Sequence, residues 1–380
     1  MSDYQPIKNP FVTSGYAGAE YFCDRVNETS TLTRLLTNQN NVALISTRRL
    51  GKTDLLRHCF AQPEIRDRYY TFEVDIYATS SLHDFVNVFG KAVLDALRPF
   101  GKKTWESFLQ VLASLRAEIS FDINGQPSWG IGLGNVVNPI TTLDEIFTYL
   151  QNADKPCLVS IDEFQQILRY PDGDKVEAAL RTYIQRCNNA NFVFSGSQRH
   201  LMGAMFTSPN RPFYQSVTII NLKPIPLDKY TEFCCQKFKD AGKTIDTEVI
   251  ETIYKRFNHT TMYMQKVMNE LFSQTPRGSH CSISMLDDAI TSLLNLSSDT
   301  YTTILSQMPE KQRNLFVAIA AEGRAPQISG GQFVRKYRLL SPSSVLSAAK
   351  GLLEKDFITQ DSNGAYMVYD LFLAEWLRKR

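Results

Sequence analysis

The sequence lacks the features that mark a secreted, membrane-spanning or zinc-binding protein. Its seven cysteines are odd in number and include no C-x-x-C pair, so neither a disulfide framework nor a zinc site is indicated. The first residues show neither the basic nor the apolar segment of a signal peptide, and no apolar run approaches the ~20 residues of a membrane helix. We therefore expect reduced thiols, a cytoplasmic location and no membrane partner.

A strong net charge is also absent. The chain of 380 residues is 43% hydrophobic and 21% charged, as in an ordinary globular protein, and its length predicts two or three domains. A formal charge of +2 implies no general attraction to nucleic acid. Residues 301–380 are mildly basic, with 11 Lys and Arg against 7 Asp and Glu, which is compatible with DNA contact but does not require it.

A β-type apolar run followed by a polar turn and a helical pattern organises the chain. Residues 42–46 form the run, and the turn carries Gly51-Lys52-Thr53, the end of a Walker A phosphate loop. Backbone N–H groups of such a loop attract phosphate oxygens, Lys52 can reach the β- and γ-phosphates, and the Thr53 hydroxyl can ligate Mg²⁺. Ser46 replaces the first glycine of the motif, and a positive φ there would be strained. The alternative is a structural turn that binds no nucleotide.

The predicted nucleotide site extends over the whole loop and includes one residue before it. Arg25 stands at the start of a predicted helix over 26–38 and could face the base or the ribose; a solvated arginine is the alternative. The predicted nucleotide-binding residues are Ser46, Thr47, Arg48, Arg49, Leu50, Gly51, Lys52, Thr53, Asp54 and Arg25.

A second apolar strand ends in two carboxylates. Residues 157–161 are continuously apolar apart from one serine, as in a buried parallel strand, and Asp162 and Glu163 follow. In this Walker B pattern Asp162 would hold Mg²⁺ through water, and Glu163 would polarise the attacking water. We expect both acids to face the metal from the strand that neighbours the phosphate-loop strand. Two exposed acids at a strand end are the alternative.

The next predicted strand, over 191–197, also ends in polar residues. In a doubly wound sheet that end lies beside the phosphate site, so Ser197 and Gln198 could sense the γ-phosphate. Ser197 thereby joins Glu163 and Lys52 as a candidate catalytic residue. Further predicted strands lie at 70–76 and 217–222. Candidates for an arginine finger or another cation at the phosphate, in cis or in trans, are Arg199, His200 and Arg211, with a surface salt bridge as the alternative for each.

An alternating segment interrupts the strand–helix rhythm of the first part of the chain. Residues 117–123 alternate with period two, Asn124-Gly125 is typical of a hairpin turn, and residues 126–133 return. We predict a hairpin insertion over about 117–134, preceded by a helix over 103–116. The hairpin packs against the sheet or forms a lid or partner surface.

The second half of the chain changes to a helical pattern and ends in a helix–helix–helix–hairpin order, which is typical of a winged helix. The predicted domains are a nucleotide-binding domain over 1–223, a helical lid over 224–298 and a winged helix domain over 299–380. The supposed recognition helix, over 343–353, is poor in the Arg, Asn and Gln that read base edges. DNA contact and a protein-contact or structural role therefore both stay open for this domain.

Several motifs together resemble one known family. They are Asn9-Pro10-Phe11, Phe22-Cys23-Asp24-Arg25, Arg48-Arg49-Leu50-Gly51-Lys52-Thr53, Ile161-Asp162-Glu163-Phe164-Gln165, Phe194-Ser195-Gly196-Ser197, Pro212-Phe213-Tyr214, and Tyr366-Met367-Val368-Tyr369-Asp370 with Trp376-Leu377-Arg378. In this order they resemble the archaeal-type P-loop ATPases of the AAA+/STAND division. The resemblance implies an α/β fold: an AAA+-like P-loop core with a parallel sheet, followed by an all-α lid and a winged helix-turn-helix domain.

The same resemblance implies ATP and Mg²⁺ as ligands and a nucleotide state that is coupled to conformation or to assembly, including a homo-oligomer. The chain departs from the family pattern at Ser46 and at Asn258-His259-Thr260-Thr261, where relatives tend to show a Gly-x-Pro-like turn. We predict an ATP-binding protein with Mg²⁺-dependent hydrolysis that acts as a conformational switch. The alternatives are a DNA-binding regulator with a structural nucleotide and a protein-interaction scaffold with a degenerate loop.

Overall fold

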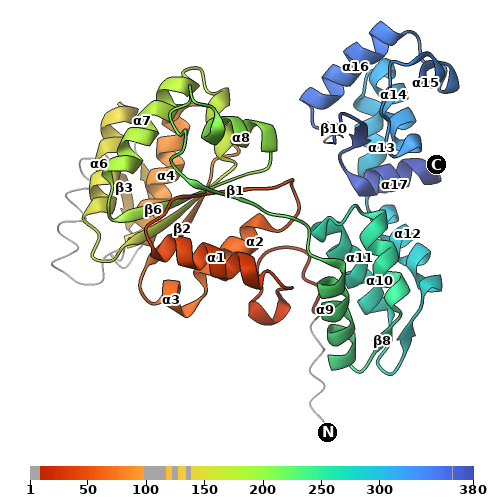
Figure 1. Ribbon diagram of the computed structural model, residues 1–380, viewed down its shortest axis with the longest axis horizontal. Helices are drawn as coiled ribbons and strands as arrows, with labels where there is room; N and C mark the ends of the chain where they lie inside the picture. Colours follow the sequence, from red (N-terminus) through yellow and green to blue (C-terminus); the bar gives the residue numbers. More distant parts are fainter. Residues whose placement is uncertain (1–8, 98–116, 122–126, 134–137, 362) are drawn as a thin grey trace. The chain divides into compact units, whose positions relative to one another are not determined.

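The computed structural model describes residues 9–97, 117–121, 127–133, 138–361 and 363–380 (Figure 1). The chain divides into two compact units. One unit comprises residues 14–225 and contains the phosphate-loop and Walker B motifs. The other comprises residues 226–380 together with the N-terminal segment up to Thr13.

The first unit is built on a parallel sheet. Within the described residues its strands follow the order β2-β5-β6-β1-β7, and every neighbouring pair is parallel. This confirms the predicted parallel α/β core. The strands are β1 (Val42–Ile45), β2 (Tyr70–Asp75), β5 (Cys157–Asp162), β6 (Ala190–Gly196) and β7 (Thr218–Asn221).

Helices cover both faces of this sheet, which is why its central strands are apolar throughout. Val42 and Leu44 of β1 pack in a cluster with residues of α1 and α2, whereas Ala43 and Ile45 pack in a cluster with residues of α4, α6 and α7. Figure 1 shows α1 and α2 on one side of the sheet and α4, α6 and α7 on the other. The helices are α1 (Val26–Thr37), α2 (Lys52–Phe60), α3 (Pro63–Arg66), α4 (Leu82–Ala96), α6 (Pro139–Gln151), α7 (Gly173–Arg186) and α8 (Arg199–Thr207), with short 3₁₀ helices η1 (Ala19–Tyr21) and η2 (Phe164–Arg169).

Local capping explains one boundary that the periodicity placed too late. The apolar pattern predicts a helix from Leu143, but α6 begins at Pro139. The Asn138 side chain accepts hydrogen bonds from the backbone N–H groups of Ile140 and Thr141, at 3.2 and 3.3 Å, and proline suits the first helical turn. Helix α3, with 4 residues, is too short to show an apolar period, and helix α8 was not predicted either.

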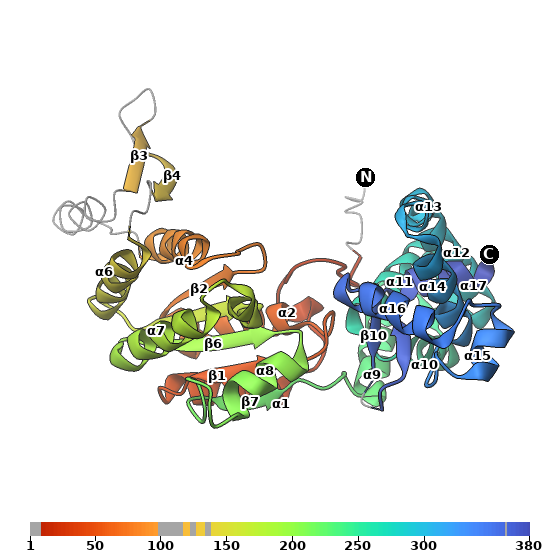
Figure 2. The same cartoon turned by 90° about the horizontal axis from the view of Figure 1, so that it is seen from above.

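The predicted hairpin insertion is present as two described strands. Strand β3 (Ala117–Phe121) pairs antiparallel with β4 (Pro127–Leu133), and this pair forms a sheet of its own rather than an extension of the five-stranded one. Strand β4 lies next to α4 (Figure 2). The predicted Asn124-Gly125 turn and the predicted helix over 103–116 lie outside the described residues.

The second unit begins with a group of helices that also holds the N-terminal segment. Phe11 is fully buried, with its ring centroid 5.8–6.0 Å from those of Phe233, Phe238 and Phe272. The Asn269 amide donates to the Phe11 carbonyl oxygen at 2.7 Å. The Asn9-Pro10-Phe11 motif therefore packs on helices that follow it by more than two hundred positions. These elements are α9 (Leu227–Asp240), β8 (Thr244–Ile245), α10 (Thr247–Arg256), α11 (Thr261–Gln274), β9 (His280–Cys281), η3 (Ile283–Met285), α12 (Leu286–Leu296) and α13 (Ser298–Gln307).

The predicted helix–helix–helix–hairpin order ends the chain. Strands β10 and β11 pair antiparallel, and Tyr366 of β11 also bridges to Ala325. The last helix returns to the helical group, because Phe372 packs edge-on against Phe257 and Tyr263. The elements are α14 (Glu310–Glu322), α15 (Gly331–Lys336), α16 (Pro342–Glu354), β10 (Ile358–Gln360), β11 (Tyr366–Val368) and α17 (Leu371–Lys379). Among the helices that the structure describes, none combines the length and apolar character needed to cross a membrane.

Candidate functional site

The phosphate loop connects the buried end of β1 with the first turn of α2. Gly51 adopts a left-handed conformation, with φ of 86°, immediately before α2, and glycine tolerates this conformation without steric cost. Leu50 is buried in the cluster of α1 and α2, so it anchors the loop to the core. Thr47 is exposed, and Arg48 and Arg49 are half-buried.

Ser46 fits the loop without the strain that its position suggested. It is fully buried and is not among the residues with positive φ, so the missing glycine costs no backbone strain at this point. Its hydroxyl donates to the Thr47 carbonyl oxygen at 2.7 Å and accepts from the Lys52 ammonium at 3.3 Å. The serine therefore supports the lysine that the motif needs.

Lys52 is buried to an unusual degree for a lysine, with 7% of its surface exposed. Burial lowers the pKa of Lys52, and the charges of Asp162 and Glu163 act in the opposite direction. An ammonium that has lost much of its water gains more from a phosphate than a solvated one does, because the local dielectric is low.

The strand order corrects one expectation about the acids. The expectation that Asp162 and Glu163 lie on the strand beside the phosphate-loop strand is wrong, because β6 lies between β1 and β5. The end of β6 bridges the gap with two small, buried residues, Ser195 and Gly196. The two motifs consequently meet across the carboxyl end of an intervening strand.

Thr53 and Asp162 converge at this edge. The Thr53 hydroxyl donates to one oxygen of Asp162, Oδ2, at 3.2 Å. The other carboxylate oxygen of Asp162, Oδ1, accepts from the Ser195 hydroxyl at 2.6 Å and from the Glu163 backbone N–H at 2.9 Å. The two predicted metal ligands are therefore neighbours, and Ser195 fixes the orientation of the carboxylate.

Glu163 lies beside this pair in a left-handed conformation, with φ of 54°. Its Oε2 accepts from the Ser197 hydroxyl at 2.8 Å, and the Ser197 oxygen in turn accepts from Nε of Arg48 at 3.1 Å. Arg48 Nε is also 4.0 Å from Glu163 Oε1, and its guanidinium lies 5.5 Å from the centre of the Tyr77 ring. A chain of hydrogen bonds thus connects the phosphate loop to the second Walker B acid.

The donor set at the site suits Mg²⁺ bound together with phosphate. One hydroxyl and one carboxylate are hard oxygen ligands, and Mg²⁺ is usually held by one or two such groups with phosphate oxygens and water. Among the described residues, no cluster of three His, Cys, Asp or Glu side chains could hold a metal by itself. Thr53 and Asp162 therefore fit a metal that arrives with a nucleotide.

Arg25 is neither solvated nor directed at open space. It is 3% exposed and adopts a left-handed conformation before α1, with φ of 67°. Its guanidinium donates to the carbonyl oxygens of Lys223, at 2.7 Å, and Leu50, at 3.4 Å, and to the Glu28 carboxylate, at 2.8 Å. Arg25 therefore supports the phosphate loop through the Leu50 carbonyl oxygen. The alternative of a solvated arginine is wrong.

Three other predicted residues, Asp54, Arg199 and Arg211, have different surroundings. Asp54 is half-buried in the first turn of α2, and burial raises its pKa while Arg57 opposes the change. Arg199 is exposed at the start of α8, and its charge adds to burial in lowering the pKa of Lys52. Arg211 donates to Asp174 at 2.8 Å and to the fully buried Glu177. The salt-bridge interpretation therefore describes Arg211.

Two residues that contact the Walker B acids had no predicted role: Ser195, which donates to Asp162, and Gln165, which donates to Glu163. Ser195 is a polar side chain that directly follows the buried apolar run Phe192–Phe194, and that contrast is a signal the sequence did contain. Gln165 follows the two acids, is 3% exposed, and donates to Glu163 Oε2 through its amide nitrogen. No sequence pattern indicated that its side chain would turn back toward Glu163.

Comparison with known proteins identifies the fold. Residues 299–379 match the family model described as "Probable winged helix domain". A Walker-type ATPase of Pyrococcus abyssi superposes with a TM-score of 0.60 and 16% identity, covering 97% of this chain and 99% of that one. The chain has the fold of a Walker-type ATPase. This fold, a P-loop core with a parallel sheet followed by helices and a winged helix, is the one predicted.

Two archaeal ORC proteins share the Walker-type fold. The ORC2 protein of Aeropyrum pernix, in ADPNP and ADP complexes, gives a TM-score of 0.58 at 13% identity and covers 98% of this chain and 96% of its own. The ORC1 protein of Aeropyrum pernix, in complex with DNA, gives 0.54 at 10% identity and covers 94% and 93%. No curated protein sequence shows significant similarity to the chain.

Proposed function

We propose that the protein binds ATP with Mg²⁺ and hydrolyses it, and that the nucleotide state sets its conformation. The observation that carries this proposal is the convergence of Lys52, Thr53, Asp162 and Glu163 from two separate strand ends on one edge of the sheet. A structural turn or a degenerate loop would not need a buried lysine, a ligand pair and a second acid in one place.

Each residue has a role that follows from its chemistry. The loop N–H groups and Lys52 would hold the phosphates. Thr53 would ligate Mg²⁺, and Asp162 would hold it through water; when bound, the metal would balance the negative charge that develops on the phosphate groups during hydrolysis. Glu163 would accept the proton of the attacking water, and Ser197, in contact with Glu163, would sense the γ-phosphate.

The test compares the wild-type protein with Lys52→Ala. ATP affinity is measured by titration of a fluorescent ATP analogue, and hydrolysis by phosphate release with Mg²⁺ present. We expect turnover by the wild type and loss of both binding and turnover in the variant. Unchanged ATP affinity in Lys52→Ala would remove the site, and absent turnover in the wild type would leave a nucleotide-binding protein that is not an ATPase.

We propose that the moving parts are those expected from the sequence: a nucleotide-binding domain over 1–223, a lid over 224–298 and a winged helix domain over 299–380. ATP would shift their relative orientation. A homo-oligomer is the assembly in which an arginine such as the exposed Arg199 could act in trans. The seven cysteines, all within the described part of the chain, are in no disulfide, which supports a reducing, cytoplasmic location.

The winged helix domain, we propose, contacts a protein rather than reading DNA bases. The exposed side chains of α16 are Pro342, Ser343, Leu346, Ser347, Lys350 and Glu354. Leu346 is 50% exposed, and Leu340, just before the helix, is 73% exposed. Major-groove helices present Arg, Asn or Gln, whereas exposed leucines favour a protein surface.

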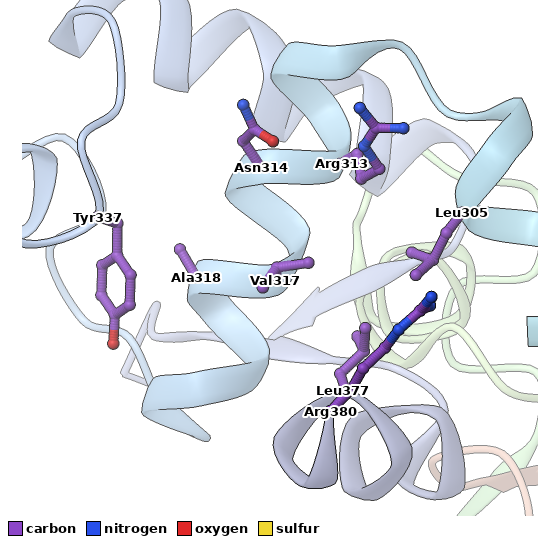
Figure 3. A pocket seen from close by; sticks show the side chains of 8 residues that line it. All are labelled: Leu305, Arg313, Asn314, Val317, Ala318, Tyr337, Leu377 and Arg380. Atoms are coloured by element: carbon purple, nitrogen blue, oxygen red, sulfur yellow. The ribbon is translucent and has the colours of Figure 1, made fainter. Parts of the chain in front are cut away.

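A pocket of 390 Å³ in the same unit supports this choice (Figure 3). It combines apolar side chains of α13, α14 and α17 with two arginines, Arg313 and Arg380. The mixture matches a partner segment that carries a carboxylate beside an apolar side chain. The residues that line the pocket are Leu305, Arg313, Asn314, Val317, Ala318, Tyr337, Leu377 and Arg380.

DNA is the alternative, supported by the fold that the chain shares with the DNA-bound ORC1 protein. The test is fluorescence anisotropy with duplex DNA at increasing salt, for the wild type and for Lys350→Ala. A protein-contact role predicts weak DNA binding that Lys350→Ala leaves unchanged. Tight binding that falls steeply with salt and weakens in Lys350→Ala would establish DNA as the partner instead.

A further inference from the structure

Gln165 occupies a buried position where an apolar side chain would give a more stable fold. It lies in η2, is 3% exposed, and its Oε1 is buried without a hydrogen-bond partner among the described residues. Burying an amide oxygen that makes no hydrogen bond costs stability. Its Nε2 donates to Oε2 of Glu163, the second Walker B acid. This is the one side-chain hydrogen bond of Gln165 among the described residues.

The same oxygen of Glu163 receives a second donor. Ser197 donates to Oε2 at 2.8 Å, so two groups from different elements hold one carboxylate oxygen. No hydrogen bond to Glu163 Oε1 is present among the described residues; Arg48 Nε approaches it to 4.0 Å. Oε1 thus makes no hydrogen bond to a described residue, and a general base needs such an oxygen to accept a proton from water.

Gly196, at the end of β6, provides the space for the glutamine. A Cβ at position 196 would overlap with Gln165 Oε1 and with the side chain of Met202. Gly196 has no positive φ that would by itself require glycine. The space left by the missing side chain is therefore occupied by the amide of Gln165 together with the side chain of Met202.

The neighbouring glutamine supplies a contrast. Gln166 donates to the Thr79 carbonyl oxygen at 2.9 Å, and this bond ties η2 to the loop that follows β2. Consecutive glutamines thus have different partners: Gln166 stabilises the backbone, and Gln165 meets the carboxylate of Glu163.

We propose that Gln165 is a positioning residue for ATP hydrolysis. Together with Ser197 it holds Oε2 of Glu163 so that Oε1 faces the attacking water, and the absence of a side chain at Gly196 leaves room for the amide beside Met202. This inference rests on the proposed function, since it concerns the same site. Gln165 acts through Glu163, to which its amide donates.

The decisive variant is Gln165→Met, which keeps the volume of the side chain and removes the donor. We expect turnover to fall about 10- to 100-fold, because a carboxylate displaced by about 1 Å loses that much. The affinity for a fluorescent ATP analogue and the melting temperature should not fall, because the apolar side chain suits the buried site. A purely structural role predicts the reverse: stability changes and turnover does not. Gln166→Met is the matched control, which should lose stability and keep turnover.

Two further comparisons separate positioning from packing. Gly196→Ala should reproduce the loss of turnover by displacing the amide, whereas Gly203→Ala, where a Cβ meets nothing within 4 Å, should not. In a Glu163→Ala background, Gln165→Met should cause no additional loss, because its only target is gone.

The failure of each idea has its own signature. No ATP turnover by the wild type defeats the proposed function and this inference with it. Wild-type turnover that Gln165→Met preserves, or an equal loss in the Glu163→Ala background, overturns the positioning role alone. A fall in analogue affinity that accounts for the whole effect also overturns it.

Discussion

The hydroxyl of Thr53 donates to Asp162 Oδ2 at 3.2 Å, although the two residues are 109 positions apart and β1, which leads into the helix of Thr53, is not a neighbour of β5, which ends at Asp162. Ser195, on the strand between them, donates to the other oxygen of Asp162 at 2.6 Å. The candidate metal site is therefore assembled by three strand ends. This relationship makes the roles of the individual residues separable by substitution.

Asp162→Asn should remove Mg²⁺-dependent hydrolysis while the fold persists. The amide keeps the shape of the side chain but loses the negative charge that the metal requires, so turnover should fall by roughly two orders of magnitude. The measurement is phosphate release across a Mg²⁺ titration, with circular dichroism as the control for folding. A normal Mg²⁺ response in this variant would place the metal elsewhere.

Glu163→Gln should separate binding from hydrolysis. The amide cannot accept the proton of the attacking water, so turnover should fall roughly 100-fold or more while ATP affinity stays near the wild-type value. Equilibrium titration with ATP and single-turnover phosphate release give the two quantities. If this variant hydrolyses ATP at the wild-type rate, Glu163 is not the base.

Ser46→Gly restores the usual first glycine of the motif, yet we expect no gain. Ser46 has no left-handed φ to relieve, and the change removes the oxygen that accepts from Lys52. The added backbone freedom should lower the free energy of unfolding by about 0.4–1 kcal/mol, with ATP binding retained. Ser46→Ala is the control, because it removes the hydroxyl without adding flexibility. Faster hydrolysis by Ser46→Gly would show that the serine restrains the loop.

Arg211→Ala should destabilise the protein and leave hydrolysis intact, because Arg211 pairs with the fully buried Glu177. Removing one partner of such a pair costs about 3 kcal/mol or more, since the other charge stays buried. Urea unfolding measures the loss at neutral pH. If Arg211→Ala has normal stability but no longer hydrolyses ATP, Arg211 acts as an arginine finger and not as a structural ion-pair partner.

The pH dependence of that loss has a definite sign. Burial raises the pKa of Glu177, with Arg211 opposing, so folding favours the protonated form. The stability that this form contributes is present below the ordinary pKa of a glutamate and is lost as pH rises through the raised value. Without Arg211 the pKa of Glu177 should rise further. The loss of stability in the variant should therefore be largest at neutral pH and become small in acid. Glu177→Gln should abolish this trend.

The sequence by itself determined the main motifs and the order of the parts of the chain that carry them. The apolar run ending in Gly51-Lys52-Thr53, the run ending in Asp162, and the final helices and hairpin were all readable, because their signals are local periods and turn residues. The tertiary structure decided which strands are neighbours. It placed β6 between β1 and β5, because several orders of parallel strands satisfy the same apolar pattern.

Contacts between distant residues were likewise decided only by folding. Arg25 braces the Leu50 carbonyl, Phe11 packs among helices of the second unit, and Gln165 turns back to Glu163. None of these contacts leaves a periodic signal, since each depends on the direction of a single side chain after the strands and helices have packed.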